Sequence, residues 1–314
     1  MMFRNAFRLF GANFSLVWKN LSYKLIVILA FSGIMVAFSV TIIKQLISAD
    51  IFKQMGALLG DMSSLSLLEF SKQVVQIVQE IVDVVALTFG DLVVNYIGII
   101  VSLFLMFLFI NMAELPMTEV IKGHMSSLSK FGFCGAYLRN FWRAFKQSLV
   151  LIIIKIPFWA IIGVSGYYIL NLMTISSLWS VLSPMLFVMI VALLISIKNT
   201  IFACFTPYLC LHDCVAYHAL SKGVDIVSHR FYRTWSNNIV YILLAFIINF
   251  VCARYTFGVS LLLTLPATIV FHNIFNMVVY YESQGMRYYI DSMTIMRTKD
   301  FCEQDSPKQA KNVI

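Results

Sequence analysis

The chain has 314 residues, of which 60% are hydrophobic and 12% are charged, and its mean hydropathy is +0.85. Soluble domains carry about 25% charged residues, so this composition excludes an ordinary soluble domain and indicates a protein that lies in lipid. The formal net charge of +8 could suggest a nucleic-acid partner. The basic residues gather at the ends of apolar runs, however, so membrane topology and anionic headgroups explain them, and we expect no nucleic-acid partner.

Residues 1–24 are predicted to form an interfacial amphipathic helix. Phenylalanines recur every three or four residues and make one apolar helical face: Phe3, Phe7, Phe10 and Phe14. Arg8 lies among them and is expected to anchor the helix in the inner headgroup layer.

Six apolar runs follow, each at or near the length of roughly 20 residues that crosses a bilayer. They cover about residues 25–43, 92–112, 149–170, 181–200, 237–253 and 257–281. The sequence therefore predicts an all-α membrane protein with a six-transmembrane-helix bundle over residues 25–281, and lipid is its first partner. Residues 282–314 are expected to be a partly disordered cytoplasmic tail.

Lys and Arg are in excess before the first run, between the second and third, and between the fourth and fifth. Since such an excess marks the cytoplasmic side, we expect both termini to be cytoplasmic. Five of the six cysteines then face the reducing side, so no disulfide framework is expected.

Two aromatic and basic segments resemble each other, Phe141–Val150 before the third run and Phe231–Val240 before the fifth. Both read aromatic, aromatic, Arg, any residue, aromatic, any residue, amide. Their interfacial anchors are predicted to be Trp142, Arg143, Tyr232, Arg233 and Trp235. A shorter version is Phe7-Arg8-Leu9-Phe10. We read three helical hairpins, each preceded by an interfacial amphipathic helix; the alternative is that every cytoplasmic helix entrance selects Arg and aromatic residues.

The outer loop contains a predicted amphipathic helix over about residues 64–89. Its apolar residues step by three and four: Leu67, Phe70, Val74, Ile77, Ile81 and Val84. Ser64 or a neighbouring serine can cap its start. We favour packing over the outer ends of the spans, with a membrane partner subunit or self-association through this helix as the alternative.

Five polar residues inside the runs form a candidate intramembrane site: Lys155, His272, Asn273, Asn276 and Asn249. Lys155 lies about 9 Å into its run at 1.5 Å per residue, within reach of the interface by snorkelling. The amides are typical of hydrogen bonds that hold helices together, which we favour over a substrate site.

A Cys and His cluster is the one metal-like pattern. On a continuous helix Cys210, Cys214 and His218 would line one face. Their spacing matches neither a zinc ribbon nor a CxxC pair, and free cysteine often behaves as a small buried hydrophobe, so we favour no metal and no cofactor.

Residues Ala113–Phe158 resemble a family of uncharacterised bacterial multi-span proteins of the YesL type. The similarity consists of the turn Glu114-Leu115-Pro116 followed by the aromatic and basic segment Arg139–Gln147. Six runs and a long outer helix depart from that smaller pattern. The resemblance implies a location in the bacterial plasma membrane, and it brings no chemistry or site residues.

The sequence contains no HExxH, GxSxG or Walker lysine loop, which favours a non-enzymatic role. We expect an accessory, assembly or scaffold component of the plasma membrane. The alternative is a small-solute transporter or channel with a polar site near Lys155 and His272.

Overall fold

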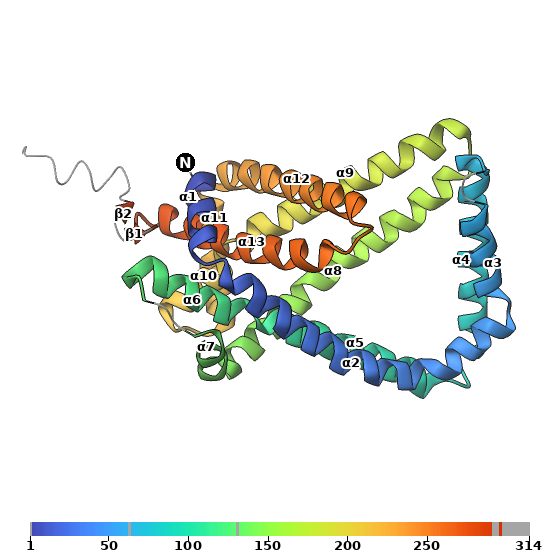
Figure 1. Cartoon of the computed structure of the whole chain (residues 1–314), viewed down its shortest axis with the longest axis horizontal. Helices are drawn as coiled ribbons and strands as arrows, with labels where there is room; N and C mark the ends of the chain where they lie inside the picture. The colour runs from blue at the N-terminus through green and yellow to red at the C-terminus, as the bar shows by residue number, and fades with distance from the viewer. Residues whose placement is uncertain (1, 62–63, 130–131, 291–294, 297–314) are drawn as a thin grey trace, which may run out of the picture. The chain divides into compact units, whose positions relative to one another are not determined.

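The structure, a computed structural model, describes residues 2–61, 64–129, 132–290 and 295–296. Within these residues the chain is almost entirely helical (Figure 1). A short antiparallel pair joins β1 (Tyr288–Tyr289) to β2 (Ile295–Met296). Six helical runs in the described part are long and apolar enough to cross a membrane, which confirms the predicted all-α membrane fold. Residues 297–314 of the expected tail lie outside the described residues.

The long helices that carry the candidate spans are α2 (Ser15–Ser48), α5 (Val93–Met112), α8 (Phe141–Met173), α9 (Ser177–Ile201), α12 (Phe231–Tyr255) and α13 (Leu261–Ser283). The shorter helices are α1 (Met2–Ala12), α3 (Ile51–Gly60), α4 (Leu67–Thr88), α6 (Glu114–Ser127), α7 (Phe133–Arg139), α10 (Phe205–His212) and α11 (Ala216–Ser228). Two of the shorter helices continue a candidate span after a short interruption: α6 follows α5, and α10 follows α9.

The long helices pair as three hairpins, as predicted. In the first, the Asn95 amide of α5 donates to the Phe38 carbonyl of α2 at 2.9 Å. In the second, Gly166 of α8 lies against the Phe187 ring of α9. In the third, the Tyr241 hydroxyl of α12 donates to the Thr268 carbonyl of α13 at 3.1 Å. Each contact joins consecutive spans, so the chain runs out and back three times.

A short helix precedes each hairpin: α1, α7 and α11. The break after α1 falls at Asn13 and the break after α7 at Asn140, and each asparagine amide donates to the carbonyl four residues earlier at 2.9 Å. Each of these carbonyls also accepts from the backbone N–H of the same asparagine, so the side chain adds a second donor at the helix end. Phe141 and Phe231 are therefore the first residues of α8 and α12 themselves, and the aromatic and arginine segments belong to the span helices.

The first hairpin has its equivalent of this entrance at Phe14, one residue after the break, rather than at Phe7. Three residues further, Val17 of α2 is buried, as are the matching Ala144 of α8 and Thr234 of α12. The three entrances thus bury the same helical position, which supports the reading of a threefold repeat.

The chain divides into two compact units. Unit 1 comprises residues 1–25, 110–151 and 196–314, and unit 2 comprises residues 26–109 and 152–195.

Unit 1 is built around α13, the most buried of the candidate spans. Helices α1, α6 and α10 pack on α13, α7 packs on α6, and α11 packs on α10. We call these five helices the short-helix layer. Its core is aliphatic and aromatic, with side chains that include Met117 and Ile121 of α6 and Ile274, Phe275 and Val278 of α13. Burial of such surface stabilises the packing of this layer on α13 by roughly 25 cal/mol per Å².

In unit 2, α3 and α4 lie side by side (Figure 1). The apolar stripe of α4 packs against α3 around Ile51, Leu58 and Ile77. The sequence predicts no separate helix at the position of α3 in the outer loop. The apolar residues of α3 cover the apolar stripe of α4. Ser66 caps α4 in a capping box with Glu69, and the hydrogen bonds from Ser66 hold the pKa of the Glu69 carboxyl below its usual value.

Candidate functional site

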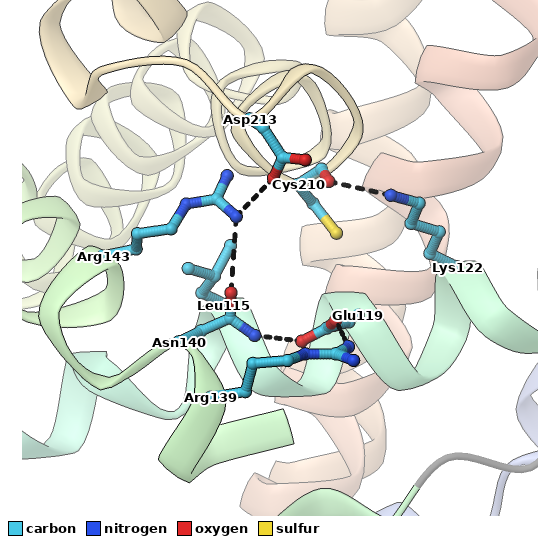
Figure 2. Close-up of a pocket in the computed structure, with 8 residues that line it drawn as sticks. All are labelled: Leu115, Glu119, Lys122, Arg139, Asn140, Arg143, Cys210 and Asp213. Atoms are coloured by element: carbon cyan, nitrogen blue, oxygen red, sulfur yellow. Dashed lines mark hydrogen bonds and ion pairs between the residues drawn. The ribbon is translucent and has the colours of Figure 1, made fainter. Parts of the chain in front are cut away.

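A polar cavity of about 380 Å³ lies in unit 1 among α6, the start of α8 and the end of α10 (Figure 2). Its lining gathers three cationic side chains, two acidic ones, an amide, a thiol and a leucine: Lys122, Arg139, Arg143, Glu119, Asp213, Asn140, Cys210 and Leu115. Convergent polar groups in a cavity are the usual sign of a binding site. We call this cavity the charged pocket.

Helix α6 brings two of the charges. Glu119 and Lys122 are three residues apart, so they lie on neighbouring positions of one helical face. Met117 and Ile121 are fully buried in the core of unit 1. Helix α6 therefore presents these two charges to the pocket while its apolar side chains fill the core.

Asp213 directly follows the last residue of α10. The helix ends at His212, and Asp213 takes a left-handed backbone with φ of 46°. Aspartate is one of the few residues besides glycine that adopts this conformation readily. The turn leads the chain from α10 toward α11, and the Asp213 carboxylate lies 2.6 Å from Nη1 of Arg143.

The opposite wall carries the second acid. Arg139 forms an ion pair with one oxygen of Glu119, and the Asn140 amide donates to the other oxygen. Figure 2 shows both side chains directed at this carboxylate. Asn140 is the residue that ends α7, and it is 6% exposed. The helix break before α8 thus positions one of the groups that orient Glu119.

The remaining cations bind backbone carbonyls. Arg143 donates through Nη2 to the Leu209 carbonyl at 2.7 Å, in addition to its contact with Asp213. Lys122 donates to the Cys210 carbonyl at 3.0 Å. Both carbonyls belong to the last turn of α10, whose end carries partial negative charge that favours cations.

A second cavity of about 260 Å³ adjoins the first. It shares the side chains of Arg143 and Asp213 and adds Lys146, Leu209, Cys214, Val215 and Ala216. The Arg143 and Asp213 pair therefore stands between the two cavities. Val215 caps α11 without a side-chain hydrogen bond to the first turn.

Four of the five predicted intramembrane polar residues lie in α12 and α13. Asn249 donates to the Ala245 carbonyl within α12 at 2.7 Å and to the Thr268 hydroxyl of α13 at 3.2 Å. The Asn276 amide lies 3.2 Å from Nε2 of His272, whose ring stacks on Tyr241 at 5.0 Å. Asn273 is 7% exposed. Asn249 and His272 thus contact the neighbouring helix of the third hairpin.

The fifth residue, Lys155, lies in the part of α8 that belongs to unit 2. Its side chain is half-buried there. We therefore describe Lys155 only as part of unit 2.

The predicted interfacial anchors differ in their surroundings. Trp142 and Tyr232 are 70% and 81% exposed. Arg8 and Arg233 are also exposed, whereas Trp235 is half-buried and its ring stacks on Phe231 at 6.1 Å. Arg143 differs from the other predicted anchors, because its guanidinium lines the charged pocket.

The expected helical face of Cys210, Cys214 and His218 does not form. Helix α10 ends at His212 and α11 begins at Ala216, so the three residues are not on one helix. The left-handed Asp213 between them breaks the periodicity on which the alignment depended. Among the described residues, no group of three or more His, Cys, Asp and Glu side chains is placed to hold a metal ion.

The sequence did not predict the charged pocket. Its charged residues lie between the second and third runs and between the fourth and fifth runs, where they served only to predict the cytoplasmic side. Two signals could have pointed to the pocket. Glu119 and Lys122 are three residues apart, and Arg139 and Arg143 are four apart, both spacings at which side chains of a continuous helix share a face. The partners on α10 carry no local signal.

A scan against protein-family models, a search of curated proteins and a search of solved structures each returned no match to this chain. The resemblance to YesL-type proteins over Ala113–Phe158 therefore stays a prediction.

Proposed function

We propose that this multi-pass membrane protein is a non-enzymatic accessory, assembly or scaffold component of the bacterial plasma membrane. In this proposal the short-helix layer is its working surface and holds a partner subunit. Both termini lie on the cytoplasmic side, as the distribution of Lys and Arg predicts.

The observation that carries the proposal is a set of exposed apolar side chains beside the two cavities. They are 70–76% exposed: Leu138, Trp142, Val215 and Tyr217. Val215 lines the second cavity, and the other three are each next in sequence to a residue that lines one of the cavities. Large exposed apolar residues around charged groups are typical of protein interfaces, where Trp and Tyr contribute most of the binding energy.

We place the partner on this layer rather than on α4, because α3 already covers the apolar stripe of α4. The amides of α12 and α13 also support the assembly role. Asn249 bonds across the third hairpin, which is the way amides join helices in lipid. The transport alternative requires Lys155, His272, Asn273 and Asn276 to meet a solute instead.

The experiment is purification of the tagged chain from native membranes in mild detergent, followed by native mass spectrometry. We expect a companion chain at fixed stoichiometry, and we expect Leu138→Glu and Tyr217→Glu to lose it. Leu87→Glu is the matched control, because Leu87 is 83% exposed on α4.

Loss of the companion in Leu87→Glu, with retention in Tyr217→Glu, would move the contact to α4. A chain that is purified alone from every preparation would contradict the proposal and favour the transport alternative. Thermal unfolding of each variant shows whether it has kept its fold.

A further inference from the structure

We propose that the charged pocket and the second cavity together bind an anion that carries a phosphate group. This goes beyond the scaffold role, because it assigns a ligand to the chain itself and requires no partner protein.

Charge is the first argument. Together the two cavities are lined by four cationic side chains, Lys122, Arg139, Arg143 and Lys146, against the carboxylates of Glu119 and Asp213. The excess is positive, and the Arg guanidinium matches phosphate geometry through paired N–H groups. A phosphate monoester would balance this excess, and a diester would balance half of it.

The ion pair between the cavities is the second argument. The Asp213 side chain is 81% exposed and that of Arg143 is 34% exposed. Exposed ion pairs contribute little to stability, so a phosphate oxygen can replace the Asp213 carboxylate at small cost. Arg143 keeps its position during this exchange, because it also donates to the Leu209 carbonyl and to Oδ1 of Asn140. The two cavities then become one.

Two further donors face the same space. The Lys122 ammonium has three N–H groups, and its bond to the Cys210 carbonyl uses one of them. Ala216 lines the second cavity at the start of α11, a helix of 13 residues whose cap Val215 makes no side-chain bond. Backbone N–H groups at such a start favour phosphate oxygens. They add to a site that the cations already define.

Size sets the class of ligand. The charged pocket holds about 380 Å³, near the lower end of the range of roughly 300–1,000 Å³ for small-molecule sites. This admits a phosphate with a small organic group. Such a group can come from a phospholipid headgroup or from a soluble phosphate compound, and Trp142, exposed beside Arg143, suits the headgroup layer.

The test uses the purified full-length chain in two formats. In uncharged detergent, binding of radiolabelled inorganic phosphate is measured at equilibrium. In nanodiscs, thermal unfolding is compared between phosphatidylcholine alone and phosphatidylcholine with phosphatidic acid. The variants are Lys122→Gln and Lys146→Gln, and Lys122→Arg keeps the charge. Lys222→Gln is the matched control, because Lys222 lies on α11 beside Asp225 and lines neither cavity.

We expect Lys122→Gln to weaken binding about tenfold, the equivalent of one charge-assisted hydrogen bond. We expect Lys122→Arg and Lys222→Gln to resemble the wild type. Binding of free phosphate that Lys122→Gln weakens assigns a soluble ligand. Stabilisation by phosphatidic acid alone, reduced in Lys122→Gln, assigns a lipid headgroup. Equal behaviour of Lys122→Gln, Lys146→Gln and Lys222→Gln, or no effect in either format, overturns the proposal.

Discussion

At the scale of single residues, the Tyr288 hydroxyl joins the first helix to the last. The Asn5 amide of α1 donates to it at 2.9 Å, and it donates to Glu282 at 3.2 Å. Tyr288 is 2% exposed, and burial is the main cause that raises the pKa of its phenol. The protonated hydroxyl is therefore the form that the folded chain requires.

We predict that Tyr288→Phe destabilises the chain by about 1–3 kcal/mol, because it leaves the buried Asn5 amide without its acceptor. Thermal unfolding in detergent measures the change. Tyr289→Phe is the control, since Tyr289 is the half-buried neighbour on the same strand. Equal melting temperatures for the two variants would show that the hydroxyl network contributes nothing.

The same network predicts a pH dependence. Because the pKa of Tyr288 is raised on folding, its contribution to stability is complete below the unfolded pKa of about 10 and is lost as pH rises through the folded value. The difference in unfolding free energy between the wild type and Tyr288→Phe should thus be constant from pH 7 to about 9 and shrink above about 10. A difference that grows with pH contradicts the assignment.

At the scale of elements, α10 and α11 approach closely at Gly223. A Cβ atom on Gly223 would lie 2.9 Å from the backbone nitrogen of Phe205, the first residue of α10. Only glycine permits this contact, because backbone atoms cannot move aside as a flexible side chain does. The approach brings α11 against α10, and the turn between these helices forms the walls of the second cavity.

We predict that Gly223→Ala costs about 1–3 kcal/mol through this overlap. Gly135→Ala is the control, because a Cβ atom at Gly135 of α7 meets nothing within 4 Å. Chemical unfolding in mild detergent compares the two. If Gly223→Ala is as stable as Gly135→Ala, the helices do not approach as closely as the structure has them.

The elements also show what sequence can predict and why the rest escapes it. Length and hydropathy identify a span from its own residues, so the six runs and three hairpins are predictable. The packing of α3 over α4 is harder to predict, since Ile51 and Leu58 of α3 form only a short apolar pattern. The charged pocket is harder still. Lys122 and its acceptor Cys210 are 88 residues apart, and Arg143 and Asp213 are 70 apart. No local pattern encodes such pairs.

At the scale of the whole molecule, the proposals for the short-helix layer depend on a predicted membrane topology in which this layer lies on the cytoplasmic side. Basic residues of the short-helix layer, among them Arg8, Lys122 and Arg139, contribute to the excess of Lys and Arg that indicates the cytoplasmic side. This prediction places the turn between α12 and α13 on the extracytoplasmic side, and Phe257 within it is 98% exposed.

We predict that a membrane-impermeant maleimide labels Phe257→Cys in intact cells, whereas the exposed native Cys134 reacts only after the membrane is permeabilised. Mass spectrometry of digested protein measures both sites in one sample. Labelling of Cys134 in intact cells, with Phe257→Cys protected, would reverse the orientation.

The contact of α1 with α13 has a consequence for how the protein is made. The Phe3 ring contacts that of Phe275 and the Phe7 ring that of Phe271, with ring centroids 5.1 and 4.6 Å apart. The ribosome therefore synthesises Phe3 and Phe7 well before Phe271 and Phe275, with a delay on the order of tens of seconds at about 5–20 residues per second. Until then the aromatic face of α1 is uncovered, and a chaperone or a quality-control protease could read it as the mark of an unfinished chain.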